Sequence, residues 1–327
     1  MTTAIDYTVD GSDLSIIDSV QAHPLMPLSA NTLTEARIIE FLDEDMRSTI
    51  VPLILAAKEE FYVQNYDQTP TTGLYTYTIP RRAAFATWRD IVWVDPLGNE
   101  IAMTELAPEY VKISYPVGNM PPIYTFGFVL QNDHIILWPP NSTVPTQYSL
   151  RMKIKRAPNH LTPSANCAQV TAVTPGSNQV TLDGNGDTTW TTALTFDAIP
   201  NYPQFTSLGD DMVITAINQV TPTATVLTFA AGDYPTGIAV GDWLCPATLS
   251  PIPQIPYDMF PLLIQRGVIR CLESLGDTQN LQVAERRYAD MAADFARTVS
   301  PRIEGARKCL VNRTANFGWN YNRAMSR

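Results

Sequence analysis

The sequence has no run of apolar residues long enough to cross a membrane, since a spanning helix needs about 18 to 20 of them. Its first residues, MTTAIDYTVDGSD, also lack the basic and apolar regions of a secretory signal, so we expect a protein made in a cytoplasm. Charged residues are scarce at 17%, against roughly 25% in an ordinary soluble domain, while 26 residues are proline. These values predict extended loops and a surface that contacts other proteins.

Lys and Arg are also few, and the net charge is −10. General nucleic-acid binding needs clustered basic residues that contact phosphates, so we do not expect it here. An acidic wall along a DNA conduit is still compatible with this charge, because such a wall must repel DNA rather than hold it.

The four cysteines, Cys167, Cys245, Cys271 and Cys309, form no CxxC pair, which argues against a zinc site. Free thiols are the default expectation for a cytoplasmic protein. A link between Cys167 and Cys245 stays open, because both flank the same segment of the chain.

Motifs for catalysis are missing as well. The three histidines lack Cys or Glu partners at metal-ligand spacing, and no nucleophile elbow, zinc-protease, P-loop or dinucleotide motif occurs. In DGNGDTTW, Asp183, Asn185 and Asp187 have the spacing of a calcium loop, but Leu194 occupies the position that needs a bidentate Glu. We interpret DGNGDTTW as a hairpin turn, and we predict no enzyme, no metal and no cofactor.

Two stretches, 33–66 and 257–298, carry apolar residues at helical spacing. Thr32 and Glu35 resemble a capping box before the first, which is predicted as two consecutive helices or one kinked helix. Both stretches need a partner for their apolar faces, so we expect a common bundle. The residues expected to pack it are Ile38, Leu42, Leu262, Ile269, Leu281, Tyr288, Met291 and Phe295. Residues 1–32 are interpreted as an extended arm.

Residues 74–158 change to alternating apolar and polar positions, which is typical of strands. RDIVWVDPLGNEI predicts a hairpin that turns at 96–99. IYTFGFVLQNDHIILWPP predicts a second hairpin that turns near Asn132 and Asp133. We expect one antiparallel sheet of four to six strands in this region.

A second β segment, 166–246, consists of Val- and Thr-rich runs separated by Gly, Pro, Asn and Asp turns. Its strand spacing suits a small barrel or a sandwich. Lys and Arg are absent from 157 to 265, so the segment has its own composition and is interpreted as an inserted domain. The predicted fold class is α+β: a helical bundle, an antiparallel sheet module and an inserted β domain, with extended termini.

The two ends of the chain carry opposite charge, which is informative about association. Residues 1–60 contain eleven acidic and three basic residues, whereas residues 301–327 contain six basic residues and one acidic residue. Segment 300–327 also has large apolar side chains, which disordered segments usually lack. It is interpreted as an arm that docks in a partner's groove, and a disordered basic tail is the alternative. The residues expected to dock are Arg302, Ile303, Arg307, Leu310, Arg313, Phe317, Trp319, Tyr321 and Arg323.

Several features follow one another in a recognisable order. They are the acidic N-terminal helices, YTYTIPRRAAFATWRDIVWVDPLGNEI, PPIYTFGFVLQNDHIILWPP, YSLRMKIKRAPNHL, GIAVGDWLCPATLSPIPQIPYDMFPLLIQRGVIRCL and PRIEGARKCLVNR. In this order and spacing the chain resembles the head-to-tail adaptor (connector) proteins of tailed bacteriophages over nearly its whole length. Segment 166–246 is absent from the smaller adaptors and looks like an accessory insertion.

The resemblance implies a structural protein of the virion neck, made in the host cytoplasm, that forms a dodecameric ring under the portal. Its helices would pack side by side around a channel through which genomic DNA passes without sequence-specific binding. The implied partners are further copies of the chain, the portal protein, and a tail, nozzle or tail-terminator protein. By position, 300–327 would be the portal-docking arm, and its repetition around a ring would add avidity.

Two alternatives stay open beside this interpretation. Gly232-Asp233-Tyr234 and Gly241-Asp242-Trp243 are two Gly-Asp-aromatic units, and exposed aromatics would suit a carbohydrate-binding surface module. The competing interpretation makes Trp243 a core aromatic on a strand that closes a small barrel. An enzyme with an unrecognised site would use carboxylates such as Asp242 or the Asp210–Asp211 pair.

Overall fold

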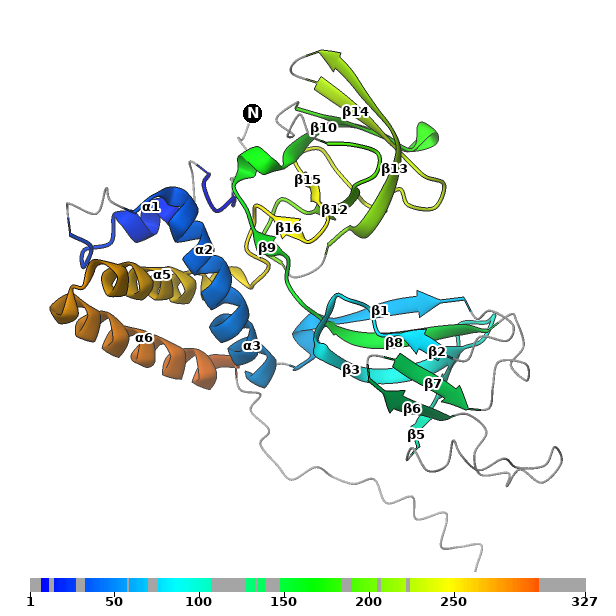
Figure 1. Ribbon diagram of the computed structural model, residues 1–327, viewed down its shortest axis with the longest axis horizontal. Helices are drawn as coiled ribbons and strands as arrows, with labels where there is room; N and C mark the ends of the chain where they lie inside the picture. Colours follow the sequence, from blue (N-terminus) through cyan, green and yellow to red (C-terminus); the bar gives the residue numbers. More distant parts are fainter. Residues whose placement is uncertain are drawn as a thin grey trace, which may run out of the picture.

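The fold is mixed α+β, in agreement with the predicted class, and its helices, sheets and barrel form three modules (Figure 1). The computed structural model describes residues 7–11, 15–27, 33–57, 59–69, 76–106, 127–132, 134–138, 148–183, 190–204, 207–221 and 224–299. No helix in these ranges is long and apolar enough to span a membrane. The portal-docking arm predicted over 300–327 lies outside the described residues.

The helical module joins segments from both ends of the described chain. Its helices are α1 (Ile16–Gln21), α2 (Glu35–Asp45), α3 (Val51–Ala57), α5 (Phe260–Leu275) and α6 (Thr278–Val299). A π-helical turn, Met46–Ile50, links α2 to α3, so this region is one interrupted helix. Of the residues expected to pack here, Ile38, Leu42, Leu262 and Ile269 are buried in one core, and Leu281, Tyr288, Met291 and Phe295 are partly buried against it.

Two local signals at the helix starts were misinterpreted from the sequence. The N-cap of α2 is Thr34, whose Oγ1 accepts from the Arg37 amide, rather than Thr32, which lies outside the described residues. Part of the predicted extended arm 1–32 is α1, capped by Ser15. That prediction was wrong because α1 buries three apolar side chains against α5 but is too short to show a helical period in sequence.

The sheet module contains two sheets instead of the single one expected. Its strands are β1 (Val63–Gln68), β2 (Thr76–Thr78), β3 (Ala83–Val94), β4 (Glu100–Ala102), β5 (Thr104–Glu105), β6 (Gly127–Gln131), β7 (His134–Trp138) and β8 (Ser149–Arg156). One sheet has the order β1-β8-β3-β4 and the other β2-β7-β6-β5. The two sheets pack face to face and share one apolar core. Each sheet thereby buries its apolar face against the other, whereas a single sheet would leave that face exposed.

The strand pairing confirms some predictions and corrects one. The hairpins predicted at 96–99 and near Asn132 are confirmed as β3–β4 and β6–β7. Residues 63–66, predicted to end a helix, instead begin β1, which pairs with β8 along its whole length. Pairing with a neighbouring strand here overrides local helical pattern, as tertiary contacts often do.

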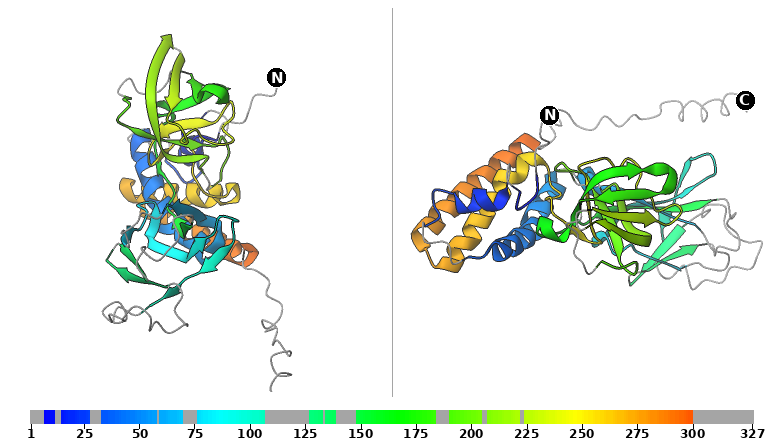
Figure 2. Two further views of the ribbon diagram at one scale, coloured as in Figure 1. Left: turned by 90° about the vertical axis from the view of Figure 1, so that its right-hand side faces the viewer. Right: turned by 90° about the horizontal axis from the view of Figure 1, so that it is seen from above.

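The inserted β segment is a closed barrel, which decides between the two predicted architectures. Its strands are β10 (Ala168–Thr174), β11 (Gln179–Leu182), β12 (Thr195–Ile199), β13 (Gly209–Thr221), β14 (Ala224–Phe229) and β15 (Trp243–Pro246), in the order β10-β11-β14-β13-β12-β15. The chain enters through β9 (His160–Leu161) and leaves through β16 (Leu249–Ser250), and these two strands pair in parallel. The barrel and the sheet module both lie beside the helical module (Figures 1 and 2).

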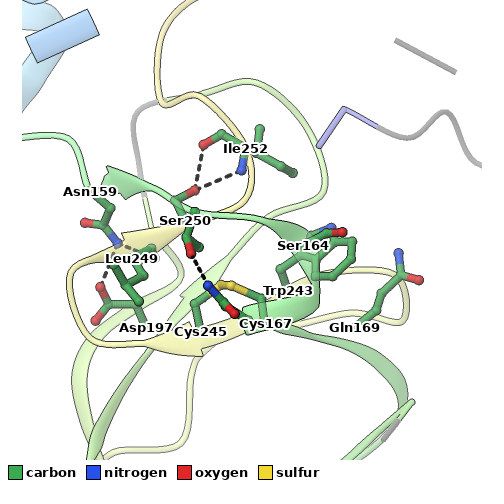
Figure 3. The surroundings of a disulfide bond; sticks show 12 residues. Asn159, Ser164, Cys167, Gln169, Asp197, Trp243, Cys245, Leu249, Ser250 and Ile252 are labelled. Atoms are coloured by element: carbon green, nitrogen blue, oxygen red, sulfur yellow. Dashed lines mark hydrogen bonds between the residues drawn. A yellow bond between two sulfur atoms is a disulfide. The ribbon is translucent and has the colours of Figure 1, made fainter. Parts of the chain in front are cut away.

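A disulfide links Cys167, which directly precedes β10, to Cys245 of β15, close to β16 (Figure 3). Cys167 and Cys245 extend the β10–β15 register by one pair beyond Ala168 and Leu244, and their Cα atoms are 4.5 Å apart. Both cysteines are fully buried in a small apolar cluster. The default expectation of free thiols is therefore wrong for this pair, because the barrel places the two side chains face to face across adjacent strands.

Candidate functional site at the junction of the modules

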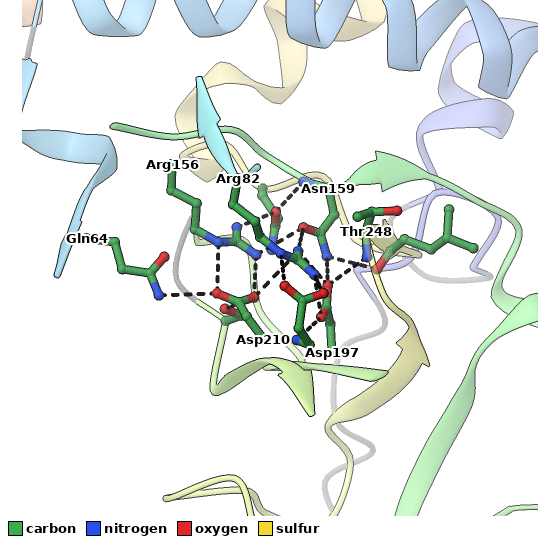
Figure 4. A network of polar contacts seen from close by, with 11 residues as sticks. Gln64, Arg82, Arg156, Asn159, Asp197, Asp210 and Thr248 are labelled. Carbon is green, nitrogen blue, oxygen red and sulfur yellow. Dashed lines mark hydrogen bonds and ion pairs between the residues drawn. The ribbon is translucent and has the colours of Figure 1, made fainter. Parts of the chain in front are cut away.

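Charged side chains gather where the sheet module meets the barrel (Figure 4). We call this group the junction cluster. Its members are Arg82, which precedes β3, Arg156 at the end of β8, Asp197 of β12, Asp210 and Asp211 of β13, and the connecting residues Asn159 and Gln254. All the cations of the cluster come from the sheet module and all its carboxylates from the barrel.

Arg82 is the centre of the cluster. Its Nη1 and Nη2 donate to Asp197 Oδ2 and Oδ1, both at 2.8 Å, in a bidentate pair. Its Nε and Nη2 also donate to Asp211, at 3.0 and 2.7 Å. The Arg82 side chain is 10% exposed and that of Asp197 is 0% exposed, so this pair is shielded from water.

Arg156 forms the second, deeper contact between the two modules. Its side chain is fully buried, and its Nη2 donates to Asp210 Oδ1 at 2.7 Å. Its Nη1 donates to Gln254 Oε1 at 3.1 Å and its Nη2 to Asn159 Oδ1 at 3.0 Å. A guanidinium with five donors suits this position, because it satisfies several acceptors from different segments at once.

The neutral members tie the connecting segments to the charged ones. Asn159 donates through Nδ2 to Asp197 Oδ2 at 2.7 Å and to the Leu249 carbonyl at 3.0 Å. The Asn159 amide donates to Gln254 Oε1 at 2.7 Å, and the Thr248 amide donates to Asp197 Oδ2 at 2.9 Å. The segments entering and leaving the barrel are therefore fixed to the same carboxylate.

The electrostatics shift the two buried carboxylates in opposite directions. Burial raises the pKa of Asp197, and the charge and hydrogen bonds of Arg82 only partly offset this. Burial also acts to raise the pKa of Asp210, but the charge and hydrogen bonds of Arg156, with Ser207, outweigh it and hold the pKa below its ordinary value. Burial acts to lower the pKa of Arg82, yet its Asp partners leave that pKa above the ordinary value. Arg82 therefore remains a cation at physiological pH.

The carboxylates that the sequence offered for catalysis accept hydrogen bonds from other groups of the fold. Asp210 and Asp211, considered as a catalytic pair in the sequence, use their oxygens to accept from Arg156 and Arg82. Asp242 accepts from the Asn201 and Ala239 amides at 3.0 and 2.8 Å, so it organises a turn. A cluster of this kind holds two modules in one relative orientation.

The aromatic residues of the carbohydrate alternative lie in the barrel rather than on an open platform. Trp243 is 7% exposed and its Nε1 donates to Asn201 at 3.4 Å. The Tyr234 ring packs edge-on against Phe229, at 6.0 Å between ring centroids. Trp243 therefore belongs to the strand that closes the barrel, as the competing interpretation expected.

Metal ligands do not converge in the described ranges: no three His, Cys, Asp or Glu side chains there form a possible site. Asp183 of the calcium-like loop accepts from the Gln169 amide at 3.2 Å, whereas Asn185 and Asp187 lie outside the described residues. His160 contacts Asp43 of α2, at 2.8 Å from its Nδ1.

The sequence interpretation missed the junction cluster, although one signal pointed to it. Residues 157–265 contain eight Asp and no Lys or Arg, so a buried carboxylate of this segment can pair only with cations from outside. Arg82 and Arg156 supply them across 115 and 54 positions of sequence.

Known proteins add no further assignment to this arrangement: no model of a protein family and no curated protein matches the chain.

Proposed function

We propose that this protein is a structural head-to-tail adaptor of a tailed bacteriophage, located in the virion neck between the portal and the tail. It acts without catalysis, by joining a portal protein above to a tail, nozzle or tail-terminator protein below. Copies of the chain form a dodecameric ring, and the genome passes through its centre during ejection without sequence-specific contacts.

The observation that carries the proposal is the position of α6. This helix packs along α5, but Ala284 is its only fully buried residue among 278–297. Phe295 and Met291 are only partly buried, and Val283 is 54% exposed. A long helix with so little burial is expected where a neighbouring helix completes the packing. Side-by-side helices of adjacent copies would close the bundle in this way.

The segment after α6 gives the proposed ring its attachment. Residues 301–327 carry six basic residues against one acidic residue, together with Phe317, Trp319 and Tyr321. Aromatic residues and Arg dominate the energetics of protein interfaces. Weak docking of each arm adds up around a ring, because the later arms bind at high effective concentration.

The junction cluster fits the same role. An adaptor must hold its two β modules at a fixed orientation to each other, so that every copy presents the same surface to the tail. Arg82 and Arg156 fix the barrel to the sheet module through shielded ion pairs.

Portal rings of the phage that encodes the chain provide the direct test. We expect the full chain to sediment with these rings and a chain ending at Val299 to remain in the supernatant. A variant with Phe317, Trp319 and Tyr321 changed to Ala, which keeps every charge, should bind at least tenfold more weakly, since interface hot spots contribute about 2 kcal/mol or more each. Equal binding of the truncated and full chains would show that the arm is not the attachment.

The ring itself is tested separately. Electron microscopy of the portal complex should show a ring of twelve copies of this chain, with α6 at the contact between neighbouring copies. Replacing Val283 by Asp, on the exposed side of α6, should leave the isolated fold intact and prevent ring completion.

A further inference from the structure

A groove lies between the helical module and the part of the sheet module where β3 begins and β8 ends. Its main cavity has a volume of about 660 Å³ and lies between Glu40, Asp43, Glu44 and Arg47 on one side and Arg81 and Pro158 on the other. A second cavity of about 410 Å³ shares Arg47, Arg81 and Pro158 and continues to His160. We treat the two cavities as one α2 groove, which is large enough for several side chains of a bound peptide.

The carboxylates of the α2 groove already have positively charged or hydrogen-bonding partners. The pairs are Glu40 with Arg37, Asp43 with His160 at 2.8 Å, and Glu44 with Arg270 at 3.0 Å. Asp43 also accepts from the Leu161 amide at 2.9 Å. The carboxylate oxygens of these three residues are thus paired with groups other than Arg47 and Arg81, the two arginines that line both cavities.

Those two arginines share the cavities with Glu40, Asp43, Glu44 and Asp211 but form an ion pair with none of them. Arg47 Nη1 lies against the imidazole of His160 and contacts its Nε2, while Nδ1 of the same ring contacts Asp43, and an imidazole cannot neutralise a guanidinium. Arg81 is exposed. Within the ranges that the structure describes, neither side chain forms an ion pair with Asp or Glu. The groove therefore presents two guanidiniums whose planar, bidentate donors match a carboxylate.

The rest of the lining selects among anions. Val51, Ala83, Ala84 and Pro158 give the groove an apolar wall, which favours a ligand that has apolar groups beside its charge. The side chains of Glu40 and Glu44, 65% and 60% exposed, add negative charge at the rim. These rim carboxylates disfavour a nucleic-acid backbone, which has a phosphate at every nucleotide, more than a peptide that has one acidic side chain beside apolar ones.

We propose that the α2 groove binds a peptide segment of a partner protein that has one acidic side chain, an Asp or Glu held between Arg47 and Arg81, and a neighbouring apolar side chain against Ala157 and Pro158. The proposal uses only the groove, and it stands whether or not the chain is an adaptor. The residues that line the groove come from other parts of the sequence than the basic segment 300–327, so the groove would be a second, separate attachment surface.

Selection from a displayed library of random dodecapeptides tests this directly. The full chain is the bait, and an Arg47→Gln/Arg81→Gln variant serves for counter-selection. We expect enriched peptides to contain Asp or Glu next to a large apolar residue. In fluorescence anisotropy, changing that acid to its amide should weaken binding about tenfold or more, as should either single Gln variant, because a hydrogen-bonded charge pair contributes about 1.5–3 kcal/mol.

Arg297→Gln provides the matched control, since Arg297 is an exposed α6 residue outside the groove. It should bind the selected peptide like the wild type, and circular dichroism should show that all variants are folded. Enrichment of peptides without acidic residues, or no enrichment, would overturn the proposal. So would displacement of the peptide by single-stranded oligothymidylate or by inorganic phosphate at concentrations that match its affinity, because the groove would then recognise phosphate.

Discussion

Arg82 and Asp197 meet through two parallel hydrogen bonds of 2.8 Å that cross from the sheet module to the barrel. The carboxylate is 0% exposed, so its charge is tolerated only because the guanidinium and three further donors surround it. The contact therefore matters to stability mainly because its loss would leave an unpaired, buried charge on Asp197.

Arg82→Met should destabilise the protein by about 3–5 kcal/mol, because the buried Asp197 then loses its counter-charge. The double variant Arg82→Met/Asp197→Asn should recover part of this loss, since the unpaired charge is gone. Urea denaturation at neutral pH measures both. Arg297→Ala, which breaks an exposed pair on α6, is the control and should change the free energy of unfolding by less than about 0.5 kcal/mol. A loss of similar size in Arg82→Met and the control would contradict a shielded junction.

Acid should weaken the same junction through Asp210. Its pKa is lower in the folded than in the unfolded chain, so its stabilising effect is present above the unfolded pKa of about 4 and is lost as pH falls through the folded value. Asp197 has the opposite sign, because its raised pKa makes the folded state bind a proton more readily. Asp210→Asn should therefore be less stable at pH 7 but lose less stability than the wild type between about pH 5 and pH 2. Urea midpoints over this range are the measurement, and parallel curves for the two proteins would contradict the assigned pKa.

The elements that could be predicted from the sequence are those whose contacts are local. The apolar period of residues 33–66 and 257–298 predicted the helices that pack together, because the apolar face of each helix is encoded within a few turns. The hairpin before Glu100 was visible for the same reason: Asp95 Oδ1 accepts from the Leu97 and Asn99 amides inside one turn.

The failures share a non-local cause. β1 is a strand because β8, more than eighty positions later, supplies its backbone partners. The two sheets of the sheet module could not be separated by alternation alone, since β3 and β6 show the same period whichever sheet they join. The pairing of Arg82 with Asp197 spans 115 positions, and only the lack of cations in 157–265 hinted that such pairs exist.

Alkaline pH should destabilise the protein through Tyr62. This phenol is fully buried, its hydroxyl donates to the Gln254 carbonyl at 3.1 Å, and burial raises its pKa far above the ordinary value. Stability from such a group is present below the unfolded pKa of about 10 and is lost as pH rises above it, because only the unfolded chain can then ionise. Tyr62→Phe should cost about 1 kcal/mol at pH 7 and lose less stability above pH 10 than the wild type.

The control for Tyr62 is Tyr66→Phe, since Tyr66 of β1 is 43% exposed. Tyr66→Phe should change the free energy of unfolding at pH 7 by less than about 0.5 kcal/mol, as exposed substitutions usually do. Burial also raises the pKa of Cys271 to about 11, but this thiol is present in every variant and cancels in the comparison. Tyr62→Phe and the wild type losing equal stability above pH 10 would contradict the prediction.

Reduction should loosen the barrel. The Cys167–Cys245 disulfide closes a loop with a sequence separation of 78, and cross-links of this length restrict the unfolded chain. We expect Cys167→Ala/Cys245→Ala, measured without reductant, to lower the free energy of unfolding by about 2–4 kcal/mol. Dithiothreitol should shift the wild-type transition in the same direction and leave the double variant unchanged. An intact-protein mass equal to that of the fully reduced chain would contradict the disulfide.

Close approach of α1, α2 and α5 makes Gly267 a sharp test of the helical module. A Cβ at this position would lie 2.9 Å from Leu42 Cδ2 and 3.0 Å from Val20 Cγ2, and both of these side chains are fully buried, so any shift that accommodates the Cβ disturbs the packing around them. In an exposed helix, replacing Gly by Ala gains about 1 kcal/mol, whereas overpacking a tight core costs about 1–3 kcal/mol. Gly267→Ala should therefore be less stable than the wild type, although Ala has the higher helix propensity.

Leu42→Ala alone should cost about 2–5 kcal/mol, and combining it with Gly267→Ala should cost clearly less than the two separate losses, because the added methyl enters the space that Leu42 vacates. Urea denaturation of the four proteins gives this coupling directly, and additive losses would show that the two residues are not in contact.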